Sequence, residues 1–470
     1  MQSTLSYRVT TRTPELLRWT GFGGAVLLTA GAWATRAVPM ALALAIAGAG
    51  LVVLAWTLLG RANPDAQWLR RTLVWWCAPV AVAPPLFSGD VFSYLAQGEV
   101  AARGLDPNVV SPAVGASAEA VARVGVYWRD TPSPYGPLFS TVERAITNLT
   151  GGDPVAGIVL YRLVAVLGLL LIVWAVPRLA AIAGTSAPAR TSAGRALWLG
   201  VLNPLVLWHL VGGVHNDALM LGLMLSGTVI ALHALPELRW WQLTAGVVLI
   251  GLGAQVKLPA LVALAVVGTA LARRLGGGWT RFVIAGVSMV AAAVVVSVLT
   301  SAGGTGFGWV RALGTPSKVN SWMAPTNWPG YLAGAVFGPE SGQAMISSAR
   351  IAGLVLILCG IAVVLRRQLR GGVSEVTALG MMMSLIVVLG PVIQPWYLLW
   401  AVLPLAACLP VGKWRTRVAA LVGVFALLVP PLAGNFAGRV PELITAYALG
   451  IALVGGAYFV LRRVPVAAQD

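Results

Sequence analysis

The first long polar interruption in this apolar chain begins within residues 84–94, which read PPLFSGDVFSY. Asp90 lies three residues beyond an apolar segment at residues 71–87, where a membrane-spanning helix would reach the edge of the hydrocarbon layer. A carboxylate at this depth loses much of its hydration, so it needs either a partner or a chemical use. Asp90 is therefore the first candidate for a functional residue.

The composition is typical of a polytopic helical membrane protein. Hydrophobic residues make up 58% of the sequence, charged residues only 10%, and the mean hydropathy is +0.84. Apolar runs of about 20 residues recur, which is the length needed to cross a hydrocarbon layer of roughly 30 Å. We predict about fourteen membrane-spanning helices, at residues 19–36, 38–59, 71–87, 155–177, 192–213, 217–235, 240–255, 257–272, 282–300, 350–365, 375–392, 397–410, 418–433 and 441–461.

The distribution of charge predicts the orientation of these helices. The net charge is +17, but Arg and Lys cluster in short alternate loops, as in Arg273-Arg274 and Arg366-Arg367. Such loops face the cytoplasm and contact anionic lipid. Both termini are therefore predicted to be cytoplasmic. Because the sequence contains no compact basic domain, we expect membrane lipid and not nucleic acid as a partner.

Two long loops, residues 88–154 and 301–349, fall on the extracytoplasmic side in this topology. Loops of this length are usually functional or disordered, and both contain tryptophans, prolines and glycines that favour compact structure on the membrane surface. We expect a single transmembrane domain over residues 1–470, in which residues 1–70 form an N-terminal two-helix extension. No separate soluble domain is predicted.

Polar residues from several distant loops meet the predicted extracytoplasmic interface and are expected to form one patch. The candidate site residues are Asp90, Asp130, Tyr135, His215, Asn216, Asp217, Lys257, Arg311, Lys318, Gln394, Trp396 and Tyr397. Since many segments contribute to this patch, we expect a site that is assembled at the membrane interface.

Asp90 is the candidate catalytic base, because a carboxylate within hydrogen-bond reach of a substrate hydroxyl can remove its proton. The alternative is that Gly89-Asp90 only caps a surface helix. Only one acid is present in this stretch, which argues against a divalent cation that clamps a nucleotide sugar. We expect no metal and no other cofactor.

Lys257 is the leading candidate for binding a phosphate, because it interrupts apolar residues on the extracytoplasmic side, where positive charge is disfavoured. A cation there suits a lipid-linked phosphate whose chain remains in the bilayer. Arg311 and Lys318 are weaker candidates for the same role. The alternatives are a lysine that snorkels from the end of a span, and charges that are simply solvated at the rim.

The remaining polar candidates are interpreted as sugar-binding residues. These are Asp130, Tyr135, His215, Asn216, Asp217, Gln394, Trp396 and Tyr397. Asp217 could equally cap the helix that follows it, and one His with one Asp is a weak metal site. Trp396 and Tyr397 suit stacking on a sugar ring, although aromatic belts at membrane interfaces are a common alternative explanation.

Five runs of sequence resemble one known family, the actinobacterial polyprenyl-phosphomannose-dependent α-1,6-mannosyltransferases. They are PPLFSGDVFSY from residue 84, GEVAARGLDPN from 98, WRDTPSPYGP from 128, GVHND from 213 and QPWY from 394. The resemblance covers most of the chain from about residue 60 and implies a membrane glycosyltransferase of GT-C type. Together with the topology above, it predicts an all-α polytopic membrane protein of GT-C type, with about fourteen transmembrane helices and two long extracytoplasmic loops. In many C-type enzymes the acid that corresponds to Asp90 follows the first helix. Here two additional predicted spans, at residues 19–36 and 38–59, precede the part of the chain that resembles the family.

The resemblance implies an inverting transfer of mannose from polyprenyl-phosphate-mannose to the 6-hydroxyl of a lipid-anchored mannoside, in synthesis of the lipomannan and lipoarabinomannan backbone. Asp90 would be the base and Lys257 would stabilise the departing phosphate. The predicted topology places the active site of this enzyme on the extracytoplasmic side of the plasma membrane. A transferase of arabinose, or one that forms another mannosyl linkage, would have the same site chemistry. A flippase or transporter is less favoured, because it would need polar groups near the bilayer midplane.

Overall fold

The computed structural model of the chain describes residues 12–34, 38–62, 64–184, 192–312, 314–315, 319–432 and 438–461. Within these ranges the regular structure is helical and no β-strand is present. The described part of the chain is therefore all-α, as predicted.

A helix lies at each predicted apolar segment, and shorter helices lie between them. The helices at the apolar segments are α2 (Arg12–Trp33), α3 (Val38–Ala62), α4 (Ala66–Ala81), α10 (Pro154–Gly184), α11 (Ala193–Ala196) with its π-helical continuation to Val201, the π-helical piece Val206–Gly212, α12 (Asp217–Ala234), α13 (Trp240–Ala254), α14 (Leu261–Arg274), α15 (Trp279–Gly303), α18 (Pro339–Leu369), α19 (Glu375–Leu389), α20 (Leu398–Cys408), α21 (Lys413–Leu428) and α22 (Val440–Leu461). The shorter helices are α5 (Asp90–Ala102), α6 (Pro112–Gly115), α7 (Ala118–Arg123), α8 (Val126–Arg129), α9 (Pro137–Thr150), α16 (Trp309–Ala312) and α17 (Trp328–Phe337).

Six helices in the described ranges are long and apolar enough to cross a membrane, or seven if the bent pair Ala193–Val201 and Val206–Gly212 is one span. The two pieces of that pair meet at an angle of 62°. The prediction of an all-α membrane protein is confirmed. The number of crossings stays a prediction, because helices such as α4, with 16 residues, are shorter than the hydrocarbon layer.

The two predicted outer loops contain much helical structure. Residues 88–154 hold α5 to α9, and the second range holds α16, α17 and the beginning of α18. α18 begins at Pro339, a position where proline is favoured, whereas we predicted a span that begins at residue 350. The first turns of α18 are rich in polar residues, so hydropathy does not mark them as part of a helix.

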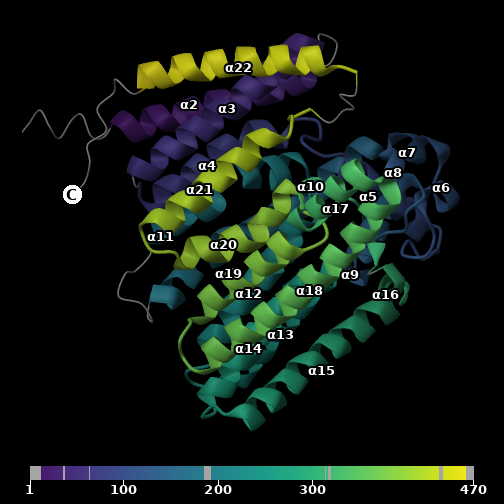
Figure 1. The fold of residues 1–470 in the computed structure, drawn as a ribbon, viewed down its shortest axis with the longest axis vertical. Helices are drawn as coiled ribbons and strands as arrows, with labels where there is room; N and C mark the ends of the chain where they lie inside the picture. Colours follow the sequence, from purple (N-terminus) through teal and green to yellow (C-terminus); the bar gives the residue numbers. More distant parts are fainter. Residues whose placement is uncertain are drawn as a thin grey trace, which may run out of the picture.

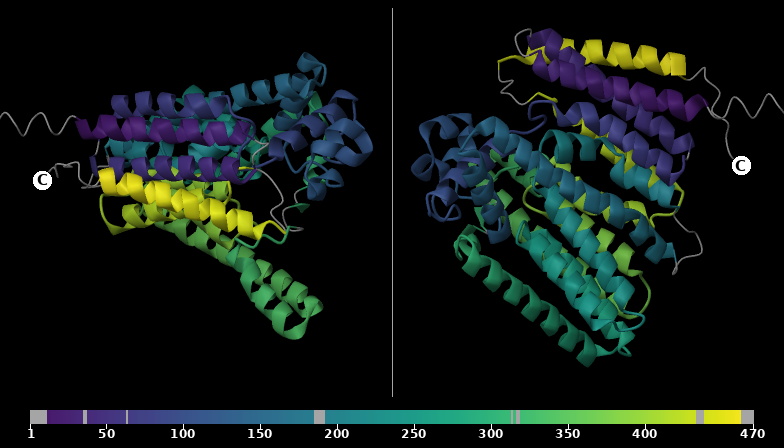
Figure 2. Two further views of the ribbon diagram at one scale, coloured as in Figure 1. Left: turned by 90° about the horizontal axis from the view of Figure 1, so that it is seen from above. Right: turned by 180° about the vertical axis from the view of Figure 1, so that it is seen from behind.

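The helices form a layered bundle in which α2, α3 and α22 lie at one end and α15 lies at the other (Figure 1). Helices α5 to α9 gather at one side of the bundle in every view (Figures 1 and 2). α3 packs against α22 through a small apolar cluster that contains Leu42, Ile46 and Ala446. The second of the two N-terminal helices, α3, is therefore packed both against α2 and against the C-terminal helix of the described chain.

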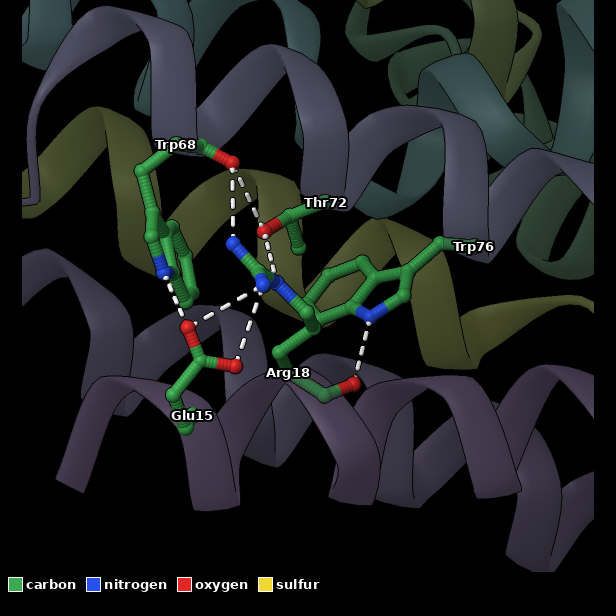
Figure 3. A network of polar contacts seen from close by, with 5 residues as sticks. All are labelled: Glu15, Arg18, Trp68, Thr72 and Trp76. Atoms are coloured by element: carbon green, nitrogen blue, oxygen red, sulfur yellow. Dashed lines mark hydrogen bonds and ion pairs between the residues drawn. The ribbon is translucent and has the colours of Figure 1, made fainter. Parts of the chain in front are cut away.

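A polar network joins α2 to α4 (Figure 3). Arg18 forms an ion pair with Glu15 at 3.0 Å and donates from Nε to the hydroxyl of Thr72 at 2.9 Å. Its guanidinium lies 4.0 Å from the ring centre of Trp68, and Nε1 of Trp76 donates to its backbone carbonyl at 2.9 Å. Because Arg18 is largely buried, these contacts compensate its desolvation and hold the two helices together.

Several helices are interrupted on the side of the bundle where α5 to α9 gather. α13 ends at Ala254 and α14 begins at Leu261, and the bent pair ends at Gly212, shortly before α12. α19 ends at Leu389, and the short helical turn Pro395–Tyr397 leads into α20. At an interruption, backbone polar groups are not all satisfied within the helix, so they and the nearby side chains can bind other groups. The candidate site residues in these segments can therefore form a site.

Candidate functional site

Asp90 is the first residue of α5 and is held by the hydroxyl of Ser88. The backbone N–H of Asp90 donates to that hydroxyl at 3.1 Å, and the hydroxyl donates to Oδ1 of Asp90 at 2.9 Å. The side chain of Asp90 is 24% exposed, so the carboxylate is fixed but still accessible to a ligand. A negative charge at the first position of a helix is also favoured by the helix dipole.

The loop that leads to this carboxylate is fixed by backbone hydrogen bonds to distant segments. The N–H of Leu86 donates to the carbonyl of Gly212 at 3.1 Å, and the N–H of Phe87 donates to the carbonyl of Pro431 at 2.9 Å. Phe87 has a φ of 61°, and its ring stacks on Trp208 with centroids 5.2 Å apart. A left-handed conformation is uncommon for phenylalanine, so these contacts hold the loop in a shape that it would not otherwise prefer.

His215 lies directly behind Asp90. Its Nδ1 is 3.3 Å from Oδ2 of Asp90, and its side chain is fully buried. One face of the imidazole stacks on Trp396, with ring centroids 3.8 Å apart. The preceding residue, Val214, has a φ of 56°, which is an outlier for a β-branched residue. Strained backbone of this kind persists only where the surrounding structure holds it in place.

The neighbours of Asp90 set its charge. Burial raises the pKa of Asp90, but His215, the hydroxyl of Ser88 and the ammonium of Lys257 lower it, and the net pKa lies below the ordinary value of 3.8. Asp90 is therefore ionised at neutral pH, which a general base requires. The basic form is lost only when the pH falls through this lowered pKa.

Lys257 lies in the interruption between α13 and α14. Its Nζ is 2.8 Å from Oδ2 of the buried Asp217, whose Oδ1 accepts a hydrogen bond from Nε1 of Trp400 at 2.7 Å. The ammonium also lies 5.0 Å from the ring centre of Tyr397 and 5.6 Å from that of Tyr135. The cation is thus balanced by a buried carboxylate and flanked by aromatic rings, which attract positive charge over their faces.

The segment that carries Tyr135 is clamped from two sides. On one side, Nδ2 of Asn108 donates to the backbone carbonyls of Ser133 and Tyr135, at 2.8 and 2.7 Å. On the other side, a Cβ atom at Gly136 would lie 2.3 Å from the backbone oxygen of Gln255. Only glycine permits this approach to the α13–α14 interruption, and the approach brings Tyr135 over the ammonium group.

Replacement of Asn108 by Ala should lower both the stability of the protein and its affinity for substrate. Two buried carbonyls would lose their donor, which we expect to cost about 1–3 kcal/mol of unfolding free energy. Thermal unfolding in detergent and the KM for substrate measure the two effects. Asn148 is exposed on α9, so Asn148→Ala should change neither quantity. An Asn108→Ala protein with the melting temperature of the wild type would contradict the clamp.

The candidate residues surround a cavity of about 300 Å³. Its polar part is lined by Asp90, Tyr135, Lys257, Gln394, Trp396 and Tyr397, and its apolar part includes Ile357, Ile386 and Val387 from α18 and α19. Nε1 of Trp396 is buried and has no hydrogen-bond partner among the described residues. Because an indole nitrogen can only donate, a ligand oxygen in this cavity would satisfy it.

The structure separates the predicted site residues into three groups. The six polar residues just named line the cavity together. Three residues, His215, Asn216 and Asp217, are buried and do not line it, so they do not face a sugar from the cavity wall. Asp130 and Arg311 are exposed and do not line it either. Lys318 lies outside the described residues.

Several residues that build the site were not singled out in the sequence. Trp400 holds Asp217 and lines the cavity, and Trp128 lines it as well. Trp400 follows Trp396 by one helical turn, so helical spacing predicts that the two share a face. Asn108 lies in the turn sequence Asp106-Pro107-Asn108, where local side-chain hydrogen bonds are common. No pattern in the sequence predicts that its side chain contacts residues 133 and 135.

Comparison with protein families matches both halves of the chain. The family model described as "Alpha-(1->6)-mannopyranosyltransferase, N-terminal domain" matches residues 23–273. The model described as "MptB C-terminal domain" matches residues 326–459. The match to the first model alone spans more than half of the chain.

Individual relatives agree with these matches. A probable α-(1→6)-mannopyranosyltransferase of Mycolicibacterium smegmatis is 41% identical over 436 residues, which cover 83% of this chain and 75% of the relative. An α-(1→6)-mannopyranosyltransferase of Mycobacterium tuberculosis is 38% identical, with 82% of this chain and 72% of the relative covered. The α-(1→6)-mannopyranosyltransferase A of the same organism is 34% identical, with 86% and 82% covered.

Proposed function

The chain belongs to the α-(1→6)-mannopyranosyltransferase family, and from this premise we propose that it moves mannose from polyprenyl-phosphate-mannose to the 6-hydroxyl of a lipid-anchored mannoside. As a member of this family it is a glycosyltransferase and an integral membrane protein. The donor, the acceptor and a role in building the lipomannan and lipoarabinomannan backbone are part of the proposal. The observation that carries it is the presence of one carboxylate and one ammonium, Asp90 and Lys257, on the wall of a single cavity.

The proposed reaction is a single in-line displacement with inversion. Asp90 takes the proton of the acceptor 6-hydroxyl while that oxygen attacks the anomeric carbon, and the bond from this carbon to the phosphate oxygen breaks. Because the pKa of Asp90 lies below its ordinary value, the carboxylate is available as a base throughout the neutral range. Trp396 and Gln394 are placed on the cavity wall, where they can bind sugar hydroxyls.

Lys257 is proposed to stabilise the departing polyprenyl phosphate. Although its ammonium contacts Asp217, the side chain of Lys257 is 15% exposed and lines the cavity, so a phosphate oxygen can approach it. Charge-assisted contacts of this kind strengthen as negative charge develops on the leaving group. Arg311 would have to move to take part, and a role for Lys318 rests on its position in the sequence alone.

An apolar groove beside the cavity supports a lipid-linked donor. The groove has a volume of about 640 Å³, and α14 and α15 provide most of its wall, including Leu264, Phe282 and Met289. Leu258 lines both this groove and the cavity, directly after Lys257 in the chain. A phosphate bound at the lysine would therefore be followed by a path for its prenyl chain.

Filling this groove should weaken binding of a long-chain donor. Gly286 lines the groove, and a Cβ atom built there meets no other atom within 4 Å, so Gly286→Trp can enter without a backbone clash. If the indole displaces about two methylene groups, at roughly 0.8 kcal/mol each, the KM for polyprenyl-phosphate-mannose should rise about tenfold. The KM for a donor with a single isoprene unit should stay close to that of the wild type.

The neighbouring residue provides a matched control for this substitution. Val287 is 63% exposed on α15 and does not line the groove, so Val287→Trp adds the same indole to the outer face of the helix. It should leave both KM values near those of the wild type. Equal effects of the two substitutions on the long-chain donor would argue against the groove.

The proposed topology follows from the charge of the loops. We place the protein in the plasma membrane as one GT-C-type domain with about fourteen crossings, cytoplasmic termini and the cavity on the extracytoplasmic face. The grouping of Arg and Lys in alternate loops supports this orientation. Single cysteines placed in the loops and labelled from outside with a membrane-impermeant maleimide would test both the orientation and the count.

A reconstituted transfer assay tests the proposed function. Purified protein, polyprenyl-phosphate-mannose and a short α-mannoside acceptor should yield a product with a new α-1,6-linked mannose, identified by linkage analysis. Transfer of arabinose from the corresponding lipid donor, or another mannosyl linkage, would replace the proposal with a related transferase. Movement of the lipid-linked sugar between leaflets without any transfer would indicate a flippase.

A further inference from the structure

We propose that His215 is a positioning residue for Asp90: from behind the cavity wall it holds the carboxylate toward the acceptor and keeps it in the basic form. This inference rests on the proposed function, because it assumes that Asp90 is the base. It gives His215 a role distinct from contact with a sugar hydroxyl.

The first support is the position of the imidazole. Nδ1 of His215 is 3.3 Å from Oδ2 of Asp90, while the other carboxylate oxygen, Oδ1, accepts from the hydroxyl of Ser88. The carboxylate is thus contacted at both oxygens, once from its own loop and once from the segment before α12. Two contacts from separate elements restrict the rotation of a side chain whose remaining surface faces the cavity.

The second support is that His215 has no access to the substrate. Its side chain is fully buried and does not line the cavity, and the ring of Trp396, which does line it, stacks on the imidazole. Neither ring nitrogen makes a hydrogen bond of ordinary geometry among the described residues, and Nδ1 has the 3.3 Å contact with Oδ2 of Asp90. The imidazole therefore faces one polar group in the site, which is the carboxylate of Asp90.

The other charged and titratable groups near the pair are few. Lys257, from the α13–α14 interruption, lowers the pKa of Asp90. Tyr94, Tyr135 and Tyr397 interact electrostatically with Asp90, and each of them also interacts with Asp217. His209 lies beside the far side of His215, with ring centroids 5.6 Å apart. Among the described residues, only His215 and Ser88 are near enough to the side chain of Asp90 to act by hydrogen bonding.

Two amide substitutions separate positioning of Asp90 from a general structural role. The amide nitrogen of asparagine lies near the place of Nδ1, whereas that of glutamine reaches the place of Nε2. His215→Asn therefore keeps a donor beside Asp90, and His215→Gln removes it while it retains a polar side chain of similar size. The comparison needs kcat and kcat/KM for mannosyl transfer from about pH 3 to pH 9, so that the range reaches below the ordinary pKa of an aspartate.

The sign of the expected pH effect follows from the groups around Asp90. Burial raises its pKa and His215 lowers it, so loss of the histidine contact should raise the pKa and make the basic form disappear at a higher pH. The acid limb of kcat/KM in His215→Gln should move up by about one pH unit. At a pH below this limb, kcat/KM of the variant should be about tenfold lower than that of the wild type. At pH 9 the rate should return to within about threefold of the wild type.

His215→Asn should keep the acid limb close to that of the wild type. His209→Phe serves as a second comparison, because it changes a buried histidine that does not contact Asp90; whatever its rate, its acid limb should not move. A uniform loss of rate at every pH in His215→Gln, or an equal shift of the limb in His215→Asn, would overturn the inference.

A failure of the inference can be distinguished from a failure of the proposed function. If wild-type protein transfers no mannose, or if Asp90→Asn is as active as the wild type, the proposed base is wrong and His215 has no base to position. If both controls behave as expected and His215→Gln shows an unchanged pH profile, only the role of His215 is wrong. If His215→Gln does not fold, the acid limb of His215→Phe in the same assay decides, and it should shift in the same direction.

Discussion

Asp90→Asn should reduce mannosyl transfer by about three orders of magnitude, with a KM for the donor close to that of the wild type. Asparagine keeps the size of the side chain and an oxygen for the hydroxyl of Ser88, but it cannot accept the proton of the acceptor hydroxyl. General-base catalysis contributes about 10² to 10⁴ in rate, which sets the size of the expected loss. Initial rates with purified protein and lipid-linked mannose measure it.

The matched control for this change is Asp130→Asn. Asp130 belongs to the same outer segment but is exposed and does not line the cavity, so this substitution should leave the rate within about twofold of the wild type. Full activity of Asp90→Asn would remove Asp90 as the base. Equal losses in both variants would mean that the outer segment tolerates no change of charge.

Lys257→Met should lower the rate of transfer by about 10² to 10³, and it should also destabilise the protein. The first effect is the loss of a cation where negative charge develops on the leaving phosphate. The second arises because Asp217, which is fully buried, would lose its ionic partner, at a cost of about 3–5 kcal/mol. Single-turnover rates and thermal unfolding in the same detergent separate the two effects.

A second substitution at Asp217 separates the role of Lys257 in catalysis from its role in stability. In the double variant Asp217→Asn with Lys257→Met, no unpaired carboxylate remains, so most of the stability should return while the rate of transfer stays low. Recovery of the rate together with stability would show that Lys257 serves only to balance Asp217. Arg311→Gln is the matched control, since Arg311 is exposed outside the cavity and its loss should change neither quantity.

Much of the fold could be predicted because hydropathy marks helices well when whole segments are apolar. The prediction was less accurate at α18, whose first turns are polar, and it treated residues 88–154 as a loop although α9 alone spans Pro137–Thr150. Helix α9 mixes polar and apolar residues along its length, so no long apolar run identifies it. Patterns that depend on one face of a helix are weaker in sequence than runs that are apolar throughout.

The site could be predicted in part for a related reason. A polar residue beside an apolar segment marks the membrane interface, and that signal drew attention to residues such as Asp90 and Lys257, which the structure places on one cavity wall. The direction of a side chain is not encoded in its position along the chain. His215 and Asp217 follow Val214, whose left-handed backbone no local pattern would predict, and both side chains are buried behind the cavity wall, in contact with Asp90 and Lys257.

The hydrogen bond from Phe87 to Pro431 also has a consequence for biosynthesis. It joins the loop before α5 to a segment beyond α21, and contacts between such distant parts of a chain form late, because a large loop must close first. The ribosome delivers the N-terminal helices to the membrane long before Pro431 is made. A chain that ends before Pro431 therefore lacks one of the supports for the loop that carries Asp90, and this loop can take its final shape only after Pro431 has been made.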